Sequence, residues 1–191
     1  MDLRDPILFN LTDRVENPGD SYAVNGVVRA SSYAVGQKEF QVEDGFSFDA
    51  VFTNTGDGIL ATGIVRASAT GACDRCLEPA SFEVAGEIQE YYLFAEPDDP
   101  DAFEDGYEVV GEDRVVDLSD AIYDAVAIDT PFVVLCDPDC KGLCPTCGAN
   151  LNRETCDCAA KRAEEDAASS PFAVLKDMSF DEEPEVSGSS V

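Results

Sequence analysis

The arrangement of eight cysteines constrains this chain more than any other feature of its sequence. They form four close pairs, numbered here along the chain: the first pair Cys73 and Cys76, the second Cys136 and Cys140, the third Cys144 and Cys147, and the fourth Cys156 and Cys158. A two-residue spacing lets both sulfurs of a turn face one ion while backbone N–H groups bond to the thiolates. Four sulfurs complete a tetrahedral Zn²⁺ site and leave no position open for water. The sequence therefore predicts two structural Zn²⁺ ions held by sulfur alone.

The sequence leaves open which pairs share an ion. The third and fourth pairs lie close together in the chain and can close one compact site, which leaves the first pair to meet the second. That second site would clip a cysteine-rich zinc module, residues 136–162, to the part of the chain before it. Because one residue between Cys156 and Cys158 is tight for two sulfurs on one ion, an alternative places the second and third pairs on one metal.

Paired cysteines also form disulfides, redox centres and iron–sulfur sites. Disulfides are typical of secreted chains, and the N-terminal residues lack the basic region and apolar run of a signal peptide. A redox pair favours a first cysteine at a helix N-terminus, whereas the strand-like residues 82–84 follow Cys76. Iron–sulfur ligation suits the same thiolates. We expect zinc in a cytoplasmic protein, and no apolar run is long enough to span a membrane.

The charge balance limits the partners and the chemistry of the chain. The 12 Lys and Arg residues face 40 Asp and Glu residues, so the net charge is −28. Nucleic-acid binders need basic surface to neutralise phosphates, so the expected partners are basic proteins, cations, or a nucleic acid approached through one exceptional patch. The chain has no histidine, which removes the commonest general base and the usual ligand of catalytic zinc. We therefore expect no enzyme activity and no small-molecule substrate.

Basic residues near the cysteines are the candidate contacts for a partner. They are Arg75, Lys141, Arg153, Lys161 and Arg162. Within residues 136–162 the basic and acidic side chains balance, apart from the thiolates, which makes this the least acidic part of the chain. These cations either screen the thiolates or contact a nucleic acid or a protein.

Residues 1–135 are predicted to form a β-rich domain. Short alternating apolar runs separated by turn signals favour a curved antiparallel sheet or a partial barrel. The Asp44-Gly45 dipeptide lies between two such runs and predicts a tight hairpin, and residues 55–58 predict another. The fold class is α+β, mostly antiparallel β, with a helix and a C-terminal cysteine-rich zinc module.

The second half of this domain is less regular in sequence. Residues 95–117 form an acidic, proline-interrupted stretch that predicts a solvated loop. Asp117 or Ser119 is the expected N-cap of a sheet-covering helix near residues 117–128. The apolar run 132–135 then predicts a short buried strand that leads into the cysteines.

The sequence resembles the YceD family, known as large ribosomal RNA subunit accumulation proteins, at several motifs. They are residues 73–79 (CDRCLEP), residues 140–152 (CKGLCPTCGANLN), residues 170–176 (SPFAVLK), residues 58–63, and Asp117-Leu118. The resemblance implies a non-enzymatic factor that supports large-subunit ribosomal RNA accumulation and ribosome biogenesis. Its implied partners are a basic ribosomal protein, large-subunit ribosomal RNA, or both. The competing hypotheses are a zinc-dependent protein that binds nucleic acid directly and a thiol oxidoreductase.

A helix is predicted at residues 161–168. The last segment, residues 163–191, shares the end of this helix and is otherwise predicted to be an acidic tail with a short apolar motif. The motif consists of Phe172, Val174, Leu175 and Met178. We expect it to pack on the chain's own sheet, because core segments are commoner than docking peptides. Deletion from Pro171 onward should then lower the melting temperature. Unchanged thermal stability with loss of partner binding would identify a docking motif instead.

Overall fold

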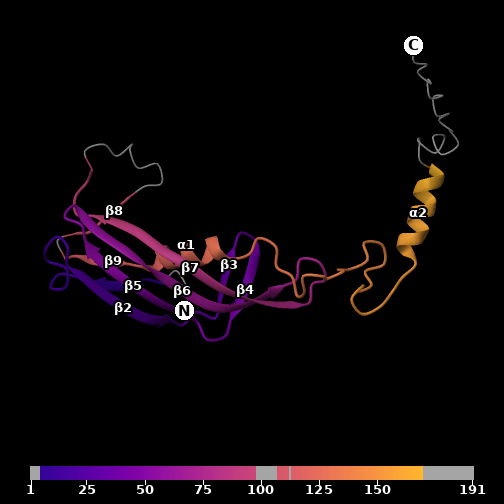
Figure 1. Ribbon diagram of the computed structural model, residues 1–191, viewed down its shortest axis with the longest axis horizontal. Helices are drawn as coiled ribbons and strands as arrows, with labels where there is room; N and C mark the ends of the chain where they lie inside the picture. Colours follow the sequence, from indigo (N-terminus) through magenta and orange to yellow (C-terminus); the bar gives the residue numbers. More distant parts are fainter. Residues whose placement is uncertain (1–4, 98–106, 112, 170–191) are drawn as a thin grey trace, which may run out of the picture. The chain divides into compact units, whose positions relative to one another are not determined.

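A computed structural model of the chain describes residues 5–97, 107–111 and 113–169 (Figure 1). The chain divides into two compact units, Met1–Cys140 and Lys141–Val191. The first contains a large sheet, a small two-stranded sheet and one helix, and the second contains a cysteine-rich loop and a helix. The apolar motif at residues 172–178 lies outside the described residues. Among the helices that the structure describes, none is long and apolar enough to cross a membrane.

The first unit is built on a seven-stranded sheet in which all pairs but one are antiparallel. Its strands are β2 (Ser21–Val28), β3 (Ser32–Val35), β4 (Lys38–Val42), β5 (Phe46–Asn54), β6 (Gly58–Ala72), β7 (Pro79–Leu93) and β8 (Glu108–Val109). The long strand β6 pairs with β7 along one edge and with β4 and β5 along the other. The sheet stays open, which confirms the predicted α+β class with a mostly antiparallel sheet.

The predicted hairpin at Asp44-Gly45 is wrong. Strands β4 and β5 do not pair with each other, because both pair with β6: Val42 lies opposite Ala69, and Ser47 lies opposite Arg66. Residues 43–46 stand between these two pairs, against residues 67–68 on β6, so the dipeptide forms a bulge in a continuing strand. Gly45 supplies the positive φ of 76° that the bulge needs. The dipeptide does mark an irregular backbone position, as its glycine indicates. It interrupts the pairing along β6 instead of joining β4 to β5, because β6 is long enough to pair with both strands.

The acidic stretch at residues 95–117 contains more structure than its composition predicts. Strand β8 extends the sheet beside β7, and β9 (Val115–Asp117) pairs with β1 (Leu8–Asn10) in a separate two-stranded sheet. Part of the stretch, residues 98–106 and 112, lies outside the described residues. The prediction of a plain loop is therefore wrong at both of these strands, which form because distant strands supply their backbone partners.

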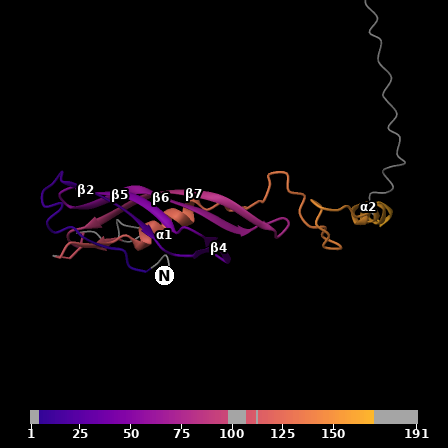
Figure 2. The ribbon, with the colours of Figure 1, turned by 90° about the horizontal axis from the view of Figure 1, so that it is seen from below.

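Helix α1 (Ser119–Asp129) covers one face of β6 and β7, as predicted (Figure 2). Its face with Ile122, Ala125 and Val126 is buried. The N-cap residue is Leu118, so neither predicted cap residue occupies that position. Asp117 still serves the helix start, because its carboxylate accepts the N–H of Ser119 at 2.9 Å.

The Asp117 carboxylate also links the helix start to the N-terminal segment. It accepts the N–H of Ile7 at 2.9 Å. Burial opposes ionisation of Asp117, but the N–H groups of Ser119 and Ile7 outweigh that effect and hold its pKa below the usual range.

The apolar run after the helix does not form the predicted strand. Phe132 is 93% exposed and Val133 is 54% exposed, and only Val134 is buried. The backbone of Val134 bonds to Asp74 instead of to a strand: its N–H donates to the carboxylate at 2.7 Å, and its C=O accepts the Asp74 N–H at 2.8 Å. Burial in the sheet therefore does not account for the apolar residues of this run.

The second unit contains α2 (Cys158–Ser169), which includes the helix predicted at residues 161–168. The loop before it is closed by a bridge between Leu143 and Asn150 and by the N–H of Lys141, which donates to the Asn152 side chain at 2.7 Å. These contacts fold residues 141–152 back on themselves.

Helix α1 packs so closely on β7 that Gly86 admits no side chain. A Cβ at this position would lie 2.1 Å from the backbone oxygen of Ala125. Gly86→Ala should therefore lower the free energy of unfolding by about 1–3 kcal/mol, because the helix must move away from the sheet. Denaturant unfolding measures the change. Ala85→Val, on the exposed face of the same strand, should stay within about 0.5 kcal/mol of wild type, and equal stability of both variants would contradict the prediction.

Candidate metal centres

The structure gathers the cysteines into two groups of four, called here the first and second tetrads. The first tetrad joins the first and second pairs, and the second tetrad joins the third and fourth pairs. Within each tetrad all four sulfurs lie within 4.8 Å of one another. The alternative that places the second and third pairs on one metal is not the observed arrangement. Each tetrad lies within one compact unit.

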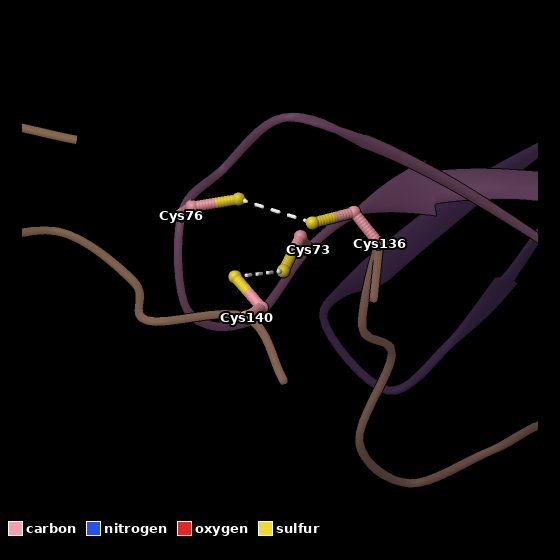
Figure 3. Close-up of side chains that lie close together, drawn as sticks. All are labelled: Cys73, Cys76, Cys136 and Cys140. Atoms are coloured by element: carbon pink, nitrogen blue, oxygen red, sulfur yellow. Dashed lines mark hydrogen bonds between the residues drawn. The ribbon is translucent and has the colours of Figure 1, made fainter. Parts of the chain in front are cut away.

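In the first tetrad the four sulfurs point toward a common centre (Figure 3). The Sγ atoms of Cys73 and Cys140 are 3.8 Å apart, and those of Cys76 and Cys136 are 3.5 Å apart. Cys73, Cys76 and Cys140 are buried, whereas Cys136 is exposed. Cys73 and Cys76 lie in the turn between β6 and β7, and Cys136 and Cys140 follow α1.

The third pair forms the same backbone turn as the first. The N–H of Cys73 donates to the C=O of Glu78 at 2.8 Å, and the N–H of Cys144 donates to that of Ala149 at 2.8 Å. The N–H groups of Leu77 and Gly148 then return to the carbonyls of the two cysteines, each at 2.9 Å. Each tetrad is thus built around one copy of the same cysteine turn.

This turn needs a positive φ at the residue after its second cysteine. Gly148 has a φ of 74° there, and Leu77 has a φ of 63°. Glycine adopts this conformation readily, whereas the exposed Leu77 fills the equivalent position with a backbone conformation that leucine rarely adopts.

Asp74 and Arg75 hold the second pair against the first. Asp74 bonds to the backbone of Val134 as described above, and its carboxylate accepts Lys38 Nζ at 2.8 Å. Lys38 and the N–H of Val134 lower the pKa of Asp74. Arg75 Nη1 donates to the C=O of Cys140 at 2.8 Å. Sequence analysis missed Asp74 and Lys38, because no spacing rule joins residues 36 positions apart.

In the second tetrad, helix α2 explains how a one-residue spacing fits. The helix begins at Cys158, so the chain turns between Cys156 and Cys158 and both sulfurs face the third pair. The spacing that looked too tight for one ion is therefore compatible with a four-sulfur group.

The electrostatics of the first tetrad favour a bound cation. Burial alone would raise the pKa of Cys73, but the N–H groups of Cys136, Arg75 and Cys76 lower it to about 6. The Cys76 sulfur raises the pKa of Cys136 to about 12. Cys73 therefore ionises readily, whereas the pKa of Cys136 shows that a second negative charge in the group is unfavourable. A divalent cation removes this unfavourable effect by binding all four sulfurs.

The second tetrad repeats this division. The N–H groups of Cys147 and Thr146 lower the pKa of Cys144 to about 6, and the Cys147 sulfur raises that of Cys158 to about 12. Both tetrads fit a metal that prefers four sulfur ligands in tetrahedral geometry.

The candidate partner residues fall in both units. Arg75 belongs to the first unit and is bonded to the Cys140 backbone. The other four are exposed residues of the second unit: Lys141, Arg153, Lys161 and Arg162. Arg162 lines a cavity of about 290 Å³ beside the second tetrad.

Comparison with known proteins identifies relatives of the chain. A family model described as "Large ribosomal RNA subunit accumulation protein YceD" matches residues 61–179. An uncharacterized protein of Mycobacterium tuberculosis is 32% identical over 153 residues, which are 78% of this chain and 72% of that protein. The chloroplastic YCED homolog 1 of Arabidopsis thaliana, named a large ribosomal RNA subunit accumulation protein, is 30% identical over 143 residues, which are 61% of this chain and 44% of that protein. The Zea mays homolog of the same name is 31% identical over 130 residues, 53% of this chain and 44% of that protein. No solved structure matches the chain.

The two tetrads predict two metal ions per chain. Elemental analysis of protein purified without chelator should find two, and Cys76→Ser or Cys144→Ser should each leave one, because three sulfurs hold an ion poorly. Cys76→Ser should also free the segment at residues 134–140 while most strands remain, visible as a lower melting temperature with retained β signal. Thr146→Ala, between two ligands, is the control and should keep both ions. A single ion in the wild-type protein would contradict the two-site arrangement.

Proposed function

This chain belongs to the YceD family of large ribosomal RNA subunit accumulation proteins, and from that premise we propose that it is a non-enzymatic factor that supports large-subunit ribosomal RNA accumulation and ribosome biogenesis. The family match carries this proposal, since residues 61–179 include all eight cysteines. The absence of histidine from the sequence supports a role without catalysis.

Zinc is the proposed metal of both tetrads. Four sulfurs within 4.8 Å of one another supply the tetrahedral sulfur environment that Zn²⁺ takes in structural sites. Iron accepts the same donors, so the elemental analysis must also identify the metal. Binding to such sites contributes directly to folding, on the order of 10–16 kcal/mol in small zinc modules.

A basic ribosomal protein is the proposed partner of the acidic first unit. A chain with a net charge of −28 attracts cationic proteins and repels bare nucleic acid. Such a factor shields the cationic protein from premature contact with RNA.

The second unit offers a surface that can approach RNA. Its four exposed basic residues, named above, equal in number the acidic residues of the segment 136–162, and Arg162 lines the cavity beside the second tetrad. This observation also supports the second candidate function, direct binding of nucleic acid, for which a steep salt dependence of RNA affinity is the diagnostic result.

We propose the cytoplasm as the place of action. None of the eight cysteines forms a disulfide, and thiols are kept reduced in the cytosol. The plant relatives are named chloroplastic, so fractionation of the native cells is the direct measurement.

Depletion of this protein should lower large-subunit ribosomal RNA relative to small-subunit RNA, because the proposed role is specific to one subunit. Quantification of the two RNAs in depleted cells measures the effect. An unchanged ratio would remove the ribosomal function and leave a metal-stabilised binding protein of unassigned role.

Reversal of Lys161 and Arg162 to glutamate should reproduce part of the depletion without loss of metal. The matched control reverses Arg29 and Arg66, which are exposed on the first unit and change the net charge by the same amount. Equal effects of the two double variants would show that total charge matters rather than the surface of the second unit.

A further inference from the structure

An apolar groove lies on the first unit, outside both tetrads. It has a volume of about 500 Å³ and lies between the turn that joins β3 to β4 and the end of α1. Its walls include Val35, Phe40, Ala127, Ile128 and Phe132. Ile128 is 85% exposed and Phe132 is 93% exposed, the highest values for large apolar side chains among the described residues. Exposed apolar side chains that gather at one groove mark an interaction site more often than scattered ones.

The exposed aromatic side chain stands on a fixed backbone. The C=O of Phe132 accepts Lys38 Nζ at 2.9 Å, and Lys38 Nζ lies 5.8 Å from the centre of the Phe132 ring. Two residues further along, both backbone groups of Val134 bond to Asp74. A partner that covers Phe132 therefore meets a segment that is already ordered, which lowers the entropic cost of binding.

Acidic side chains lie on the helix face that leads to the groove. Asp120 and Asp124 are exposed on α1 and precede Ile128 by two turns and one turn of the same helix face. The last turn of α1 carries no basic residue, so the negative end of the helix dipole remains uncompensated by its own side chains. Lys38, the cation that lines the groove, forms an ion pair with Asp74 at 2.8 Å.

We infer that this groove is the docking site for a basic protein segment, which places a large apolar side chain between Ile128 and Phe132 and its Lys or Arg residues along Asp120 and Asp124. The inference rests on the proposed function, because it names the surface that binds the basic partner. RNA fits the groove less well, since its phosphates would meet the acidic helix. A second copy of this chain would bring the same negative charges to the contact.

Binding of synthetic peptides to the full metal-loaded chain tests the chemistry of the groove. The first probe contains Lys, Leu and Phe, the second replaces Lys with Glu, and the third replaces Leu and Phe with Ser. Fluorescence anisotropy should show at least about tenfold tighter binding of the first probe than of either other probe. Equal binding of the first and third probes would reduce the interaction to unspecific charge attraction and overturn the inference.

Variants locate the binding in the groove. Ile128→Ser and Phe132→Ser should each weaken binding of the first probe by about tenfold or more, whereas Val27→Ser, exposed on β2, should leave it unchanged. Asp124→Lys should weaken binding more than Glu87→Lys, which makes the same charge change on β7. Metal content and melting temperature verify that each variant is folded. Wild-type affinity of the Ile128 and Phe132 variants would overturn the inference.

The other occupants give different results. If light scattering shows an oligomer that Phe132→Ser dissociates, a second copy covers the groove and the inference is wrong. If Phe132→Ser removes binding of a single-stranded oligouridylate, the groove serves RNA and the inference is again wrong.

Rescue of depleted cells separates this inference from the proposed function. If depletion shifts the subunit RNA ratio and Phe132→Ser restores it fully, the function stands and the groove is not its docking site. If depletion shifts no ratio, the ribosomal partner is excluded, while the peptide affinities still decide whether the groove binds basic segments. Failure of Phe132→Ser to rescue, with Val27→Ser rescuing, supports the inference.

Discussion

The first tetrad is the constraint that ties the segment after α1 to the end of the sheet. Its two halves are far apart in the chain, since Cys76 and Cys136 are separated by 60 residues. The whole of β7 and α1 lies between them, so an ion on the four sulfurs closes a long loop around the elements that form much of the core. Closing such a loop restricts the unfolded chain strongly. The paired strands β6 and β7 deliver the first half of the site at their shared end, and packing of α1 on β7 delivers the second.

Asp74 connects the first tetrad to the surface of the protein. Its carboxylate binds Lys38 and the N–H of Val134, and Lys38 in turn binds the backbone of Phe132. The same residue that aligns the second pair of cysteines thus fixes the exposed aromatic side chain of the groove. The two features share a set of hydrogen bonds, and this explains why an apolar run outside the sheet has a defined conformation.

The second unit uses the same cysteine turn with a different second half. Its other two sulfurs come from the start of α2 rather than from a distant segment, so this tetrad closes within a short stretch of sequence. Because its four cysteines lie close together in the sequence, their spacing was enough to predict that they share one site. This closeness in sequence also leaves the surrounding loop free to carry exposed basic residues in a chain that is otherwise strongly acidic.

The sequence by itself determined the features that depend on neighbouring residues. Alternating apolar residues predicted most strands and their mostly antiparallel pairing, local signals predicted the sheet-covering helix near residues 117–128, and the cysteine spacing predicted sites with four sulfurs. Tertiary structure decided the rest, because its cause lies in residues distant along the chain. Asp44-Gly45 became a bulge since β6 is long enough to pair with the strands on both sides of it. Phe132 stayed exposed since Asp74 and Lys38 bind the backbone around it, and the first tetrad formed since α1 brings Cys136 and Cys140 back to the end of the sheet.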